Sequence, residues 1–445
     1  MMLENQYSFK QIIKIAAPIS VAILIPQLSF LTNTAFLGRL GASELGVNAL
    51  SGVFYLLLSM LGYGLTSGIQ VQMSRRIGEG DHAGLVSLLK HSMVLVLSFS
   101  FVLMLIASFL VPYLYDQVLH DATNRYLNQS FFSIRIWGLP FLMLTHLFNT
   151  FFISINKTTS LIWGSLLSTL TNILFDYLLI FGHAGMPMLG IQGAAYASVF
   201  AEVVYAAIMI SQFAFSSDTK SYVLKNAGAL KIDTMLQSLK VAAPLIVQFL
   251  FSIGGWQIFF IFVEHLGKLE LASSQILRSI FGVVGVATWA FASTTNTLVS
   301  KAIGADQSHL VLQIIKRIAF ISLGFTLLIC SLLLLFANSF LTLYTQDVAI
   351  IKMALPSLQV IVLAMGIMSL ATVVFNGVVG TGNTLINLIM EISCVGVYLI
   401  YCFIVIEQHK ASLQWAWMSE FVYWSSLLIL SIGYLYSGKW KGKRV

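Results

Sequence analysis

The sequence predicts an all-α integral membrane protein, with twelve transmembrane helices arranged as two pseudo-symmetric six-helix bundles. Three observations lead to this fold class: an apolar composition, twelve long apolar runs and an internal repeat. Of the 445 residues, 58% are hydrophobic and only 9% are charged, and the mean hydropathy is +0.89. Soluble domains carry about 25% charged residues, so the composition excludes an ordinary soluble protein.

Twelve apolar runs are long enough to cross a bilayer, for which a helix needs about 20 apolar residues. An even number of spans places both termini on the same side of the membrane. The runs cover residues 15–37, 48–73, 92–115, 130–153, 160–182, 191–214, 236–263, 274–299, 314–337, 350–376, 385–406 and 412–436.

The distribution of basic residues orients these spans. Seventeen Lys and Arg residues fall on the side of the termini, five fall on the other side, and Arg135 and Arg278 fall within spans. Because positive residues are retained in the cytoplasm, we expect both termini to be cytoplasmic, in a bacterial-type inner (plasma) membrane. Contact with anionic lipids accounts for the net charge of +7, so nucleic acid is not expected as a partner.

The second half of the chain repeats the first half at an offset of 226 residues, without a gap over about 140 positions. Each half holds six spans, so the halves share one orientation and are related by a pseudo-two-fold axis along the membrane normal. We predict an N-terminal bundle at 1–214, a polar cytoplasmic linker at 215–235 and a C-terminal bundle at 236–445. Two such bundles suit alternating access. Matching residues include Lys14, Ala16, Ala17 and Pro18 with Lys240, Ala242, Ala243 and Pro244, and Gly41 and Glu44 with Gly267 and Glu270.

Polar residues that the repeat does not duplicate are the strongest candidates for function. Asn172 and Asp176 lie four residues apart in span five, so their side chains share one face of a helix. A carboxylate inside a bilayer is costly, and persists mainly where it faces a cavity, a partner or an ion. A carboxyl group kept neutral by a neighbour is the structural alternative. The corresponding residues of the second half are Tyr398 and Cys402, so the pair belongs to the first half alone.

Spans one and six add polar residues to this pair. Span one carries Gln27, Asn33 and Thr34. Ser198 and Glu202 are four residues apart on span six and therefore share a face. We expect a polar pocket between spans one, five and six.

Other ionisable residues in the spans have two open interpretations. Glu391 and Glu420 either line a cavity of the second bundle or pair structurally. His146 titrates near neutral pH or is a hydrogen-bonded packing residue. Arg135 lies near the outer start of span four, where extension to the lipid headgroups is the usual behaviour. No catalytic signature and no cysteine spacing for metal is present, so neither enzymatic activity nor a cofactor is expected.

These motifs, taken together, resemble the MATE family, the multidrug and toxic compound extrusion transporters, over essentially the whole chain. The segment Asn33-Thr-Ala-Phe-Leu-Gly38-Arg39-Leu-Gly41 is similar to the family's Asp-Thr-x-x-x-Gly-Arg-x-Gly. Paired motifs at 148–158 and 375–384 resemble those that follow spans four and ten. Asn172-x-x-x-Asp176, followed by 190–198, looks like the DinF-like branch of the family.

The resemblance implies a binding site for H⁺ or Na⁺ in the first-half pocket. By position, its ligands fall on Asn33, Asn172, Asp176 and Ser198. Asn33 is an amide where the family has a carboxylate, so it cannot exchange a proton at physiological pH, although its oxygen can bind a cation. Asp176 is then the only titratable group of the four. It either holds Na⁺ together with the oxygens of Asn33 and Asn172 or carries a proton itself, because burial favours the neutral form of a carboxyl group.

A second branch of the family, the NorM-like branch, has acids in spans seven and ten. The nearest positions in this chain are Ser252 and Met368, so we expect that coupling site to be absent.

The favoured hypothesis is a secondary active antiporter that exports amphipathic, cationic organic compounds in exchange for H⁺ or Na⁺. The expected partners are small-molecule substrates and membrane lipids, and the chain is expected to function as a monomer. One alternative is a lipid-linked oligosaccharide flippase of the same superfamily, whose members line the cavity with several cationic residues. Only Arg135 and Arg278 fall in spans here, which argues against it. A membrane-embedded enzyme and a channel are further alternatives.

Overall fold

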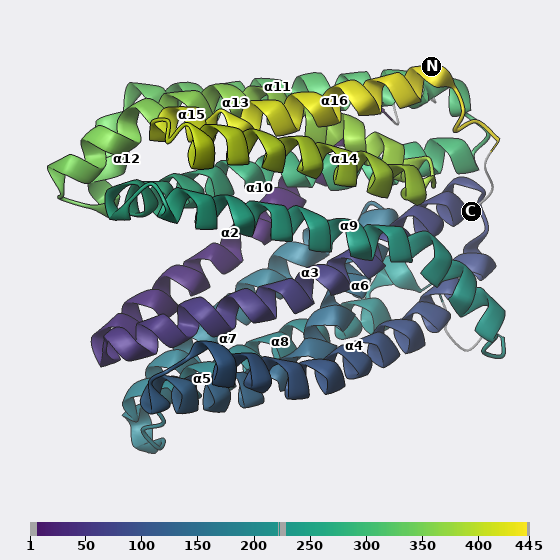
Figure 1. The fold of residues 1–445 in the computed structure, drawn as a ribbon. Coiled ribbons are helices and arrows are strands. Elements are labelled where there is room, and N and C mark those ends of the chain that lie inside the picture. The colour runs from purple at the N-terminus through teal and green to yellow at the C-terminus, as the bar shows by residue number, and fades with distance from the viewer. Residues whose placement is uncertain (1–6, 221, 223–227, 443–445) are drawn as a thin grey trace. The chain divides into compact units, whose positions relative to one another are not determined.

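The computed structural model describes residues 7–220, 222 and 228–442, which form helices joined by short connections (Figure 1). Part of the predicted linker, at 221 and 223–227, and the basic end of the chain at 443–445 lie outside the described residues. Within the described ranges, twelve helices are long and apolar enough to cross a membrane. This confirms the predicted all-α membrane fold.

Residues group into two units by their contacts. We call residues 21–246 the N-terminal unit, and residues 1–20 with 247–445 the C-terminal unit. The two breaks, after Ser20 and Ile246, lie 226 residues apart, which is the offset of the sequence repeat. The boundary between the units therefore crosses the first long helix of each half, at positions that match in the repeat. The predicted domain boundaries at the 215–235 linker stay a prediction.

The N-terminal unit contains most of the first seven helices and the start of α9. In this unit α7 packs along α8, and α6 contacts α3, α4 and α8. The helices are α2 (Phe9–Leu40), α3 (Ala42–Gly78), α4 (His82–Val118), α5 (Ala122–Arg135), α6 (Leu139–Ser154), α7 (Thr159–Phe181) and α8 (Ile191–Phe215).

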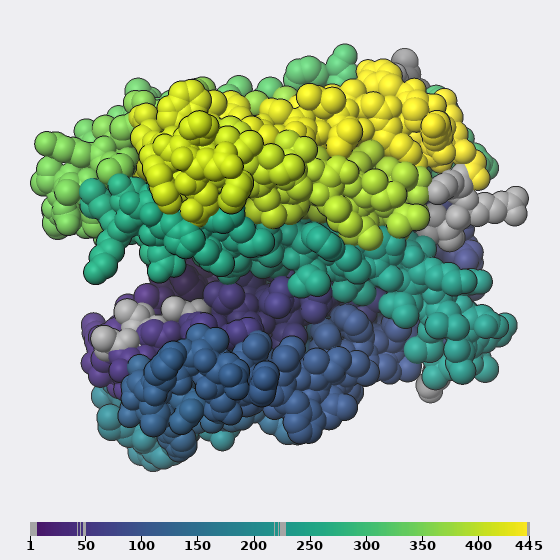
Figure 2. All heavy atoms as spheres, viewed as in Figure 1, coloured from purple at the N-terminus to yellow at the C-terminus, as the bar shows by residue number. Residues whose placement is uncertain are grey.

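The C-terminal unit is organised around α13, which contacts α10, α11 and α16. Figure 2 shows α14 and α16, in yellow-green and yellow, as one continuous surface of packed side chains. The helices are α9 (Ile232–Glu264), α10 (Lys268–Gly304), α11 (Val311–Leu335), α12 (Ala337–Tyr344), α13 (Val348–Gly380), α14 (Thr384–Cys402), the π-helix η6 (Phe403–Gln408), α15 (Leu413–Trp417) and α16 (Ser419–Ser437).

Large apolar side chains remain on the outside of these units. On α4, for example, Phe101, Leu105 and Phe109 are 53%, 62% and 74% exposed. A soluble protein rarely exposes several neighbouring large apolar side chains to water, whereas lipid chains are as apolar as these side chains. The outer faces therefore fit a multi-pass membrane protein.

The repeat extends to the backbone of the first turn in each half. Gly41 and Gly267 precede α3 and α10 with nearly the same conformation, φ 159° and ψ 171° against φ 152° and ψ 169°. This region of φ/ψ space is essentially restricted to glycine. In each turn a glutamate of the first helical turn, Glu44 or Glu270, lies against the glycine where a Cβ atom would be placed. The glycines match in the repeat because the turn requires them.

We expect Gly267→Ala to lower the stability of the protein by about 1–3 kcal/mol, because alanine is strained in this conformation. The measurement is thermal unfolding of the detergent-purified protein. Gly282→Ala in α10 is the matched control, because its added Cβ meets nothing within 4 Å and alanine favours a helix interior. A melting temperature of Gly267→Ala equal to that of Gly282→Ala would contradict the strain argument.

Candidate functional site

The centre of the candidate site is a pair of buried side chains on α7. Asn172 and Asp176 are 5% and 0% exposed, respectively, and lie one helical turn apart. Four residues correspond to slightly more than one turn, so both side chains point from the same face of α7. The sequence predicted this shared face.

Two residues of α2 contact this pair. The hydroxyl of Ser29 donates a short hydrogen bond to Asn172 Oδ1. Asn33, one turn further along α2, lies with its side-chain nitrogen 3.3 Å from the same oxygen. Since the repeat of 3.6 residues per turn brings Ser29 and Asn33 to one face of α2, a single helix edge supplies both contacts.

The amide of Asn33 also faces the carboxyl group of Asp176. When the amide is turned over, its nitrogen donates to Asp176 Oδ1 at 3.2 Å and to Oδ2 at shorter range. Asn33 can therefore donate either to Asn172 or to Asp176. The nitrogen of Asn172, by contrast, has no hydrogen-bond partner. The orientation of the Asn33 amide thus decides whether its nitrogen bonds to Asn172 or to Asp176.

The structure brings together three of the four predicted ligands, and adds one that the sequence argument missed. Asn33, Asn172 and Asp176 form the cluster, whereas within the described part of the chain no hydrogen bond joins Ser198 of α8 to it. Ser29 was missed, although its place four residues before Asn33 was a usable signal. The assignment of all four as cation ligands stays a prediction.

Glu202 lies in a different environment from that of Asp176. Its carboxylate forms a bidentate ion pair with Arg135, at 2.7 and 2.8 Å, and accepts from the hydroxyl of Tyr55 at 2.8 Å. The guanidinium group of Arg135 also stacks on the Tyr55 ring, 3.6 Å from its centroid. The expectation that Arg135 extends to the lipid headgroups is therefore wrong. Its countercharge is inside the unit, where Glu202 offsets the cost of burying it.

The predicted residues at the edge of the pocket do not join the cluster. Gln27 is exposed, and the hydroxyl of Thr34 donates to the backbone oxygen of Phe30 in its own helix at 2.8 Å. A hydroxyl bonded to the preceding turn is satisfied locally. That Gln27 and Thr34 line a cavity stays a prediction.

The remaining ionisable candidates are buried in packed surroundings. In the C-terminal unit, Glu391 of α14 and Glu420 of α16 are 0% and 3% exposed. Glu420 accepts a hydrogen bond from Trp424 Nε1 at 2.9 Å. In the N-terminal unit, His146 Nε2 lies 3.3 Å from Ser59 Oγ, which favours a hydrogen-bonded packing histidine.

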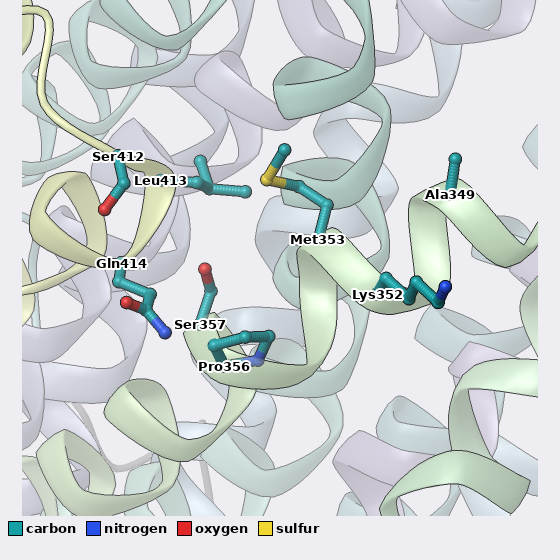
Figure 3. A pocket seen from close by; sticks show the side chains of 8 residues that line it. All are labelled: Ala349, Lys352, Met353, Pro356, Ser357, Ser412, Leu413 and Gln414. Carbon is teal, nitrogen blue, oxygen red and sulfur yellow. The ribbon is translucent and has the colours of Figure 1, made fainter.

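A pocket of about 330 Å³ lies in the C-terminal unit, between the start of α13 and the start of α15. Ser357 and Gln414 face the same space, while Lys352 extends away from Gln414 (Figure 3). None of the predicted coupling residues lines it. The pocket is therefore separate from the candidate site.

Oxygen atoms dominate the ligand chemistry that the cluster offers. One carboxyl group, two amides and a hydroxyl group converge there, and hard cations prefer such ligands. Among the described residues, no group of three or more His, Cys, Asp and Glu side chains could hold a metal ion. The cluster suits H⁺ or a weakly held monovalent cation better than a transition metal.

The chain belongs to the MatE family, whose model matches residues 18–178 and again residues 244–404. The two matches begin and end 226 residues apart, which agrees with the internal repeat. MatE proteins are transporters, and the resemblance drawn from the motifs is confirmed at this level; the DinF-like branch stays a prediction.

Relatives and solved structures agree with this membership. The chain is 23% identical to a probable multidrug resistance protein NorM of Thermotoga maritima, with 98% of this chain and 94% of that protein covered. It is 24% identical to a FAD transporter of Shewanella oneidensis, with 72% and 71% covered. An outward-facing multidrug resistance MATE family transporter of the MOP superfamily has the same fold, with a TM-score of 0.85 at 17% identity, covering 97% of this chain and 96% of that one.

We expect Glu202→Gln to destabilise the protein by about 1–3 kcal/mol, because it leaves the Arg135 side chain, which is only 15% exposed, without a countercharge. Asp176→Asn should be neutral or stabilising, because it removes a buried carboxyl group that has no ion-pair partner among the described residues. Thermal unfolding in detergent compares the two variants.

The double variant Arg135→Gln/Glu202→Gln is the control and should recover part of the lost stability, since no unpaired charge remains. If Asp176→Asn were the more destabilising of the two single variants, the distinction between a paired and an unpaired acid would be wrong.

Proposed function

We propose that this protein is a multidrug efflux transporter that exports amphipathic, cationic organic compounds in exchange for H⁺ or Na⁺. Asp176 is the coupling carboxyl group, and Asn33, Asn172 and Ser29 surround the exchanged ion. The family membership and the names of the relatives support export of organic compounds. The coupling ion, the substrate class and the antiport mechanism belong to the proposal.

One observation carries the role of Asp176. Its side chain is 0% exposed, and no ion pair in the described part of the chain involves it. An ionised carboxylate in such a place is costly unless a cation or a proton compensates for the charge. Glu202, in the same unit, has a permanent countercharge in Arg135. Asp176 is therefore the acid of this unit that an exchangeable ion can occupy.

The amide of Asn33 explains how an ion can be held and released. When Asp176 is protonated or binds a cation, the Asn33 oxygen can face it, and the Asn33 nitrogen donates to Asn172. When Asp176 is ionised and has no cation, the turned amide donates its nitrogen to the carboxylate. Turning over Asn172 as well lets its nitrogen donate to the Asn33 oxygen. Both states of Asp176 then have hydrogen bonds, so the cost of losing the ion is reduced.

The duplicated architecture supports alternating access. Two units related by the repeat can rearrange around substrate, and binding of an ion at Asp176 would bias that rearrangement in one unit only. The basic residues in the loops support cytoplasmic termini, and we propose the inner membrane as the location. The ion pair between Arg135 and Glu202 leaves this arginine unavailable for a diphosphate, which argues against the oligosaccharide flippase. Saturable, gradient-driven exchange would exclude a channel.

We expect Asp176→Asn to reduce gradient-driven substrate efflux to the level of empty liposomes, because the site can no longer bind an exchangeable ion. The measurement is efflux of a cationic dye from proteoliposomes under separately imposed pH and Na⁺ gradients. Asp347→Asn is the control, since asparagine caps a helix as well as aspartate does, and should export normally. Full efflux by Asp176→Asn under both gradients would refute the coupling role.

We expect Asn33→Asp to raise the number of protons exchanged for each substrate molecule. An aspartate at position 33 adds a second group to the site that can take up and release a proton, which the wild-type amide cannot do. The ratio of proton flux to substrate flux in proteoliposomes measures this change. An unaltered ratio, together with normal transport, would mean that position 33 does not touch the exchanged ion.

A further inference from the structure

The C-terminal unit contains a second pair of an amide and an acid with the spacing found on α7. Asn387 and Glu391 lie four residues apart on α14, and both are 0% exposed. They are not the repeat of Asn172 and Asp176, because their own repeat positions on α7 are Leu161 and Ser165. The pair therefore arises independently of the duplication.

Only one of the two carboxylate oxygens of Glu391 has hydrogen-bond partners. Its Oε1 accepts a short hydrogen bond from the hydroxyl of Ser252 on α9 and another from the hydroxyl of Tyr423 on α16 at 2.7 Å. Its Oε2 is buried and has no hydrogen-bond partner. A carboxylate oxygen in this state pays the cost of leaving water without any compensation.

Asn387, one turn earlier on α14, also has a buried oxygen without a hydrogen-bond donor. Its nitrogen donates to the backbone oxygen of Phe375 on α13 at 3.2 Å, which fixes the orientation of the amide. Its Oδ1 is buried and has no donor. Side chains four residues apart on a helix are within reach of each other, so one small donor can reach both unsatisfied acceptors. A water molecule could donate to both oxygens, but only a proton or a cation also neutralises the charge of an ionised Glu391.

Among the described residues, no positively charged side chain is in contact with Glu391. On α14 the neighbouring titratable group is Cys394, and on α16 it is Tyr423, which also interacts with Glu420. The contacts from α9 and α13 come from a serine hydroxyl and a backbone carbonyl group. No ion pair in the part of the chain that the structure describes involves Glu391. The compensation for its carboxylate must therefore come from outside the protein.

We propose that Asn387 and Glu391 form a second proton-binding site, in the C-terminal unit. A proton from water bonds to Glu391 Oε2, and the resulting O–H group donates to Asn387 Oδ1, so that one proton satisfies both oxygens. Because Oε1 already accepts two hydrogen bonds, only two oxygens remain free, too few for a dehydrated metal cation, which takes about six oxygen ligands. Ser252 and Tyr423 hold the carboxyl group in place.

The two carboxyl groups lie toward opposite ends of equivalent helices. Asp176 is in the last turns of α7, which ends at Phe181, whereas Glu391 is in the second turn of α14, which begins at Thr384. The second site does not depend on the coupling role proposed for Asp176.

Infrared difference spectroscopy of the purified full-length protein, between alkaline and acidic pH and without substrate, tests this proposal. We expect a band of a protonated carboxyl group that persists in Asp176→Asn and is absent in Glu391→Gln. In Asn387→Leu, which leaves Glu391 intact, the band should persist at a higher frequency because the acceptor of its O–H group is gone. If Glu391→Gln does not fold, the shift of the band in Asn387→Leu still tests the proposal.

Three outcomes would overturn the proposal: identical carboxyl bands in wild type and Glu391→Gln, a band unaffected by Asn387→Leu, or a band that Na⁺ removes at constant pH. The last would assign the site to a metal cation. The infrared experiment measures no transport. It can therefore contradict the proton site at Glu391 without contradicting the coupling role of Asp176, which the efflux assay tests.

Discussion

A carboxyl group that is buried without an ion-pair partner is the constraint around which the polar residues of the N-terminal unit are arranged. Asp176 is 0% exposed in this conformation and has no ion pair among the described residues, so its neighbours must accommodate a charge that comes and goes. A permanent arginine partner would hold the ionised form. The amides of Asn33 and Asn172 instead offer dipoles that can turn, and the hydroxyl of Ser29 can donate or accept.

The same unit shows the other way to bury an acid. Glu202 is neutralised by Arg135, which is bidentate and stacked on Tyr55, so this group of three is rigid and its charge is fixed. Removing either partner would leave an isolated charge. The contrast between Glu202 and Asp176 shows why burial alone does not identify a coupling acid. The partner decides whether the proton or cation can leave.

Duplication of the chain has preserved backbone requirements more strictly than side-chain chemistry. Gly41 and Gly267 adopt the same glycine-specific turn, and Asp121 and Asp347, also 226 residues apart, each accept hydrogen bonds at the start of a helix. Both bundles need these glycine turns and aspartate caps to form their helices. The polar groups within the bundles follow a different rule, because an ion site is useful in a particular place and costly elsewhere. Asp176 accordingly has Cys402 as its counterpart.

The sequence by itself determined the twelve spans, the repeat, the family and the pairing of Asn172 with Asp176 on one face. Each of these depends on hydropathy or on spacing along a single helix, which are local properties of the chain. Only the tertiary structure decided which helix faces meet. Arg135 and Glu202 are separated by 67 residues, and Ser252 and Glu391 by 139, so no periodicity could pair them. The packing of the helices thus decides which buried acid receives a countercharge and which is left for an ion.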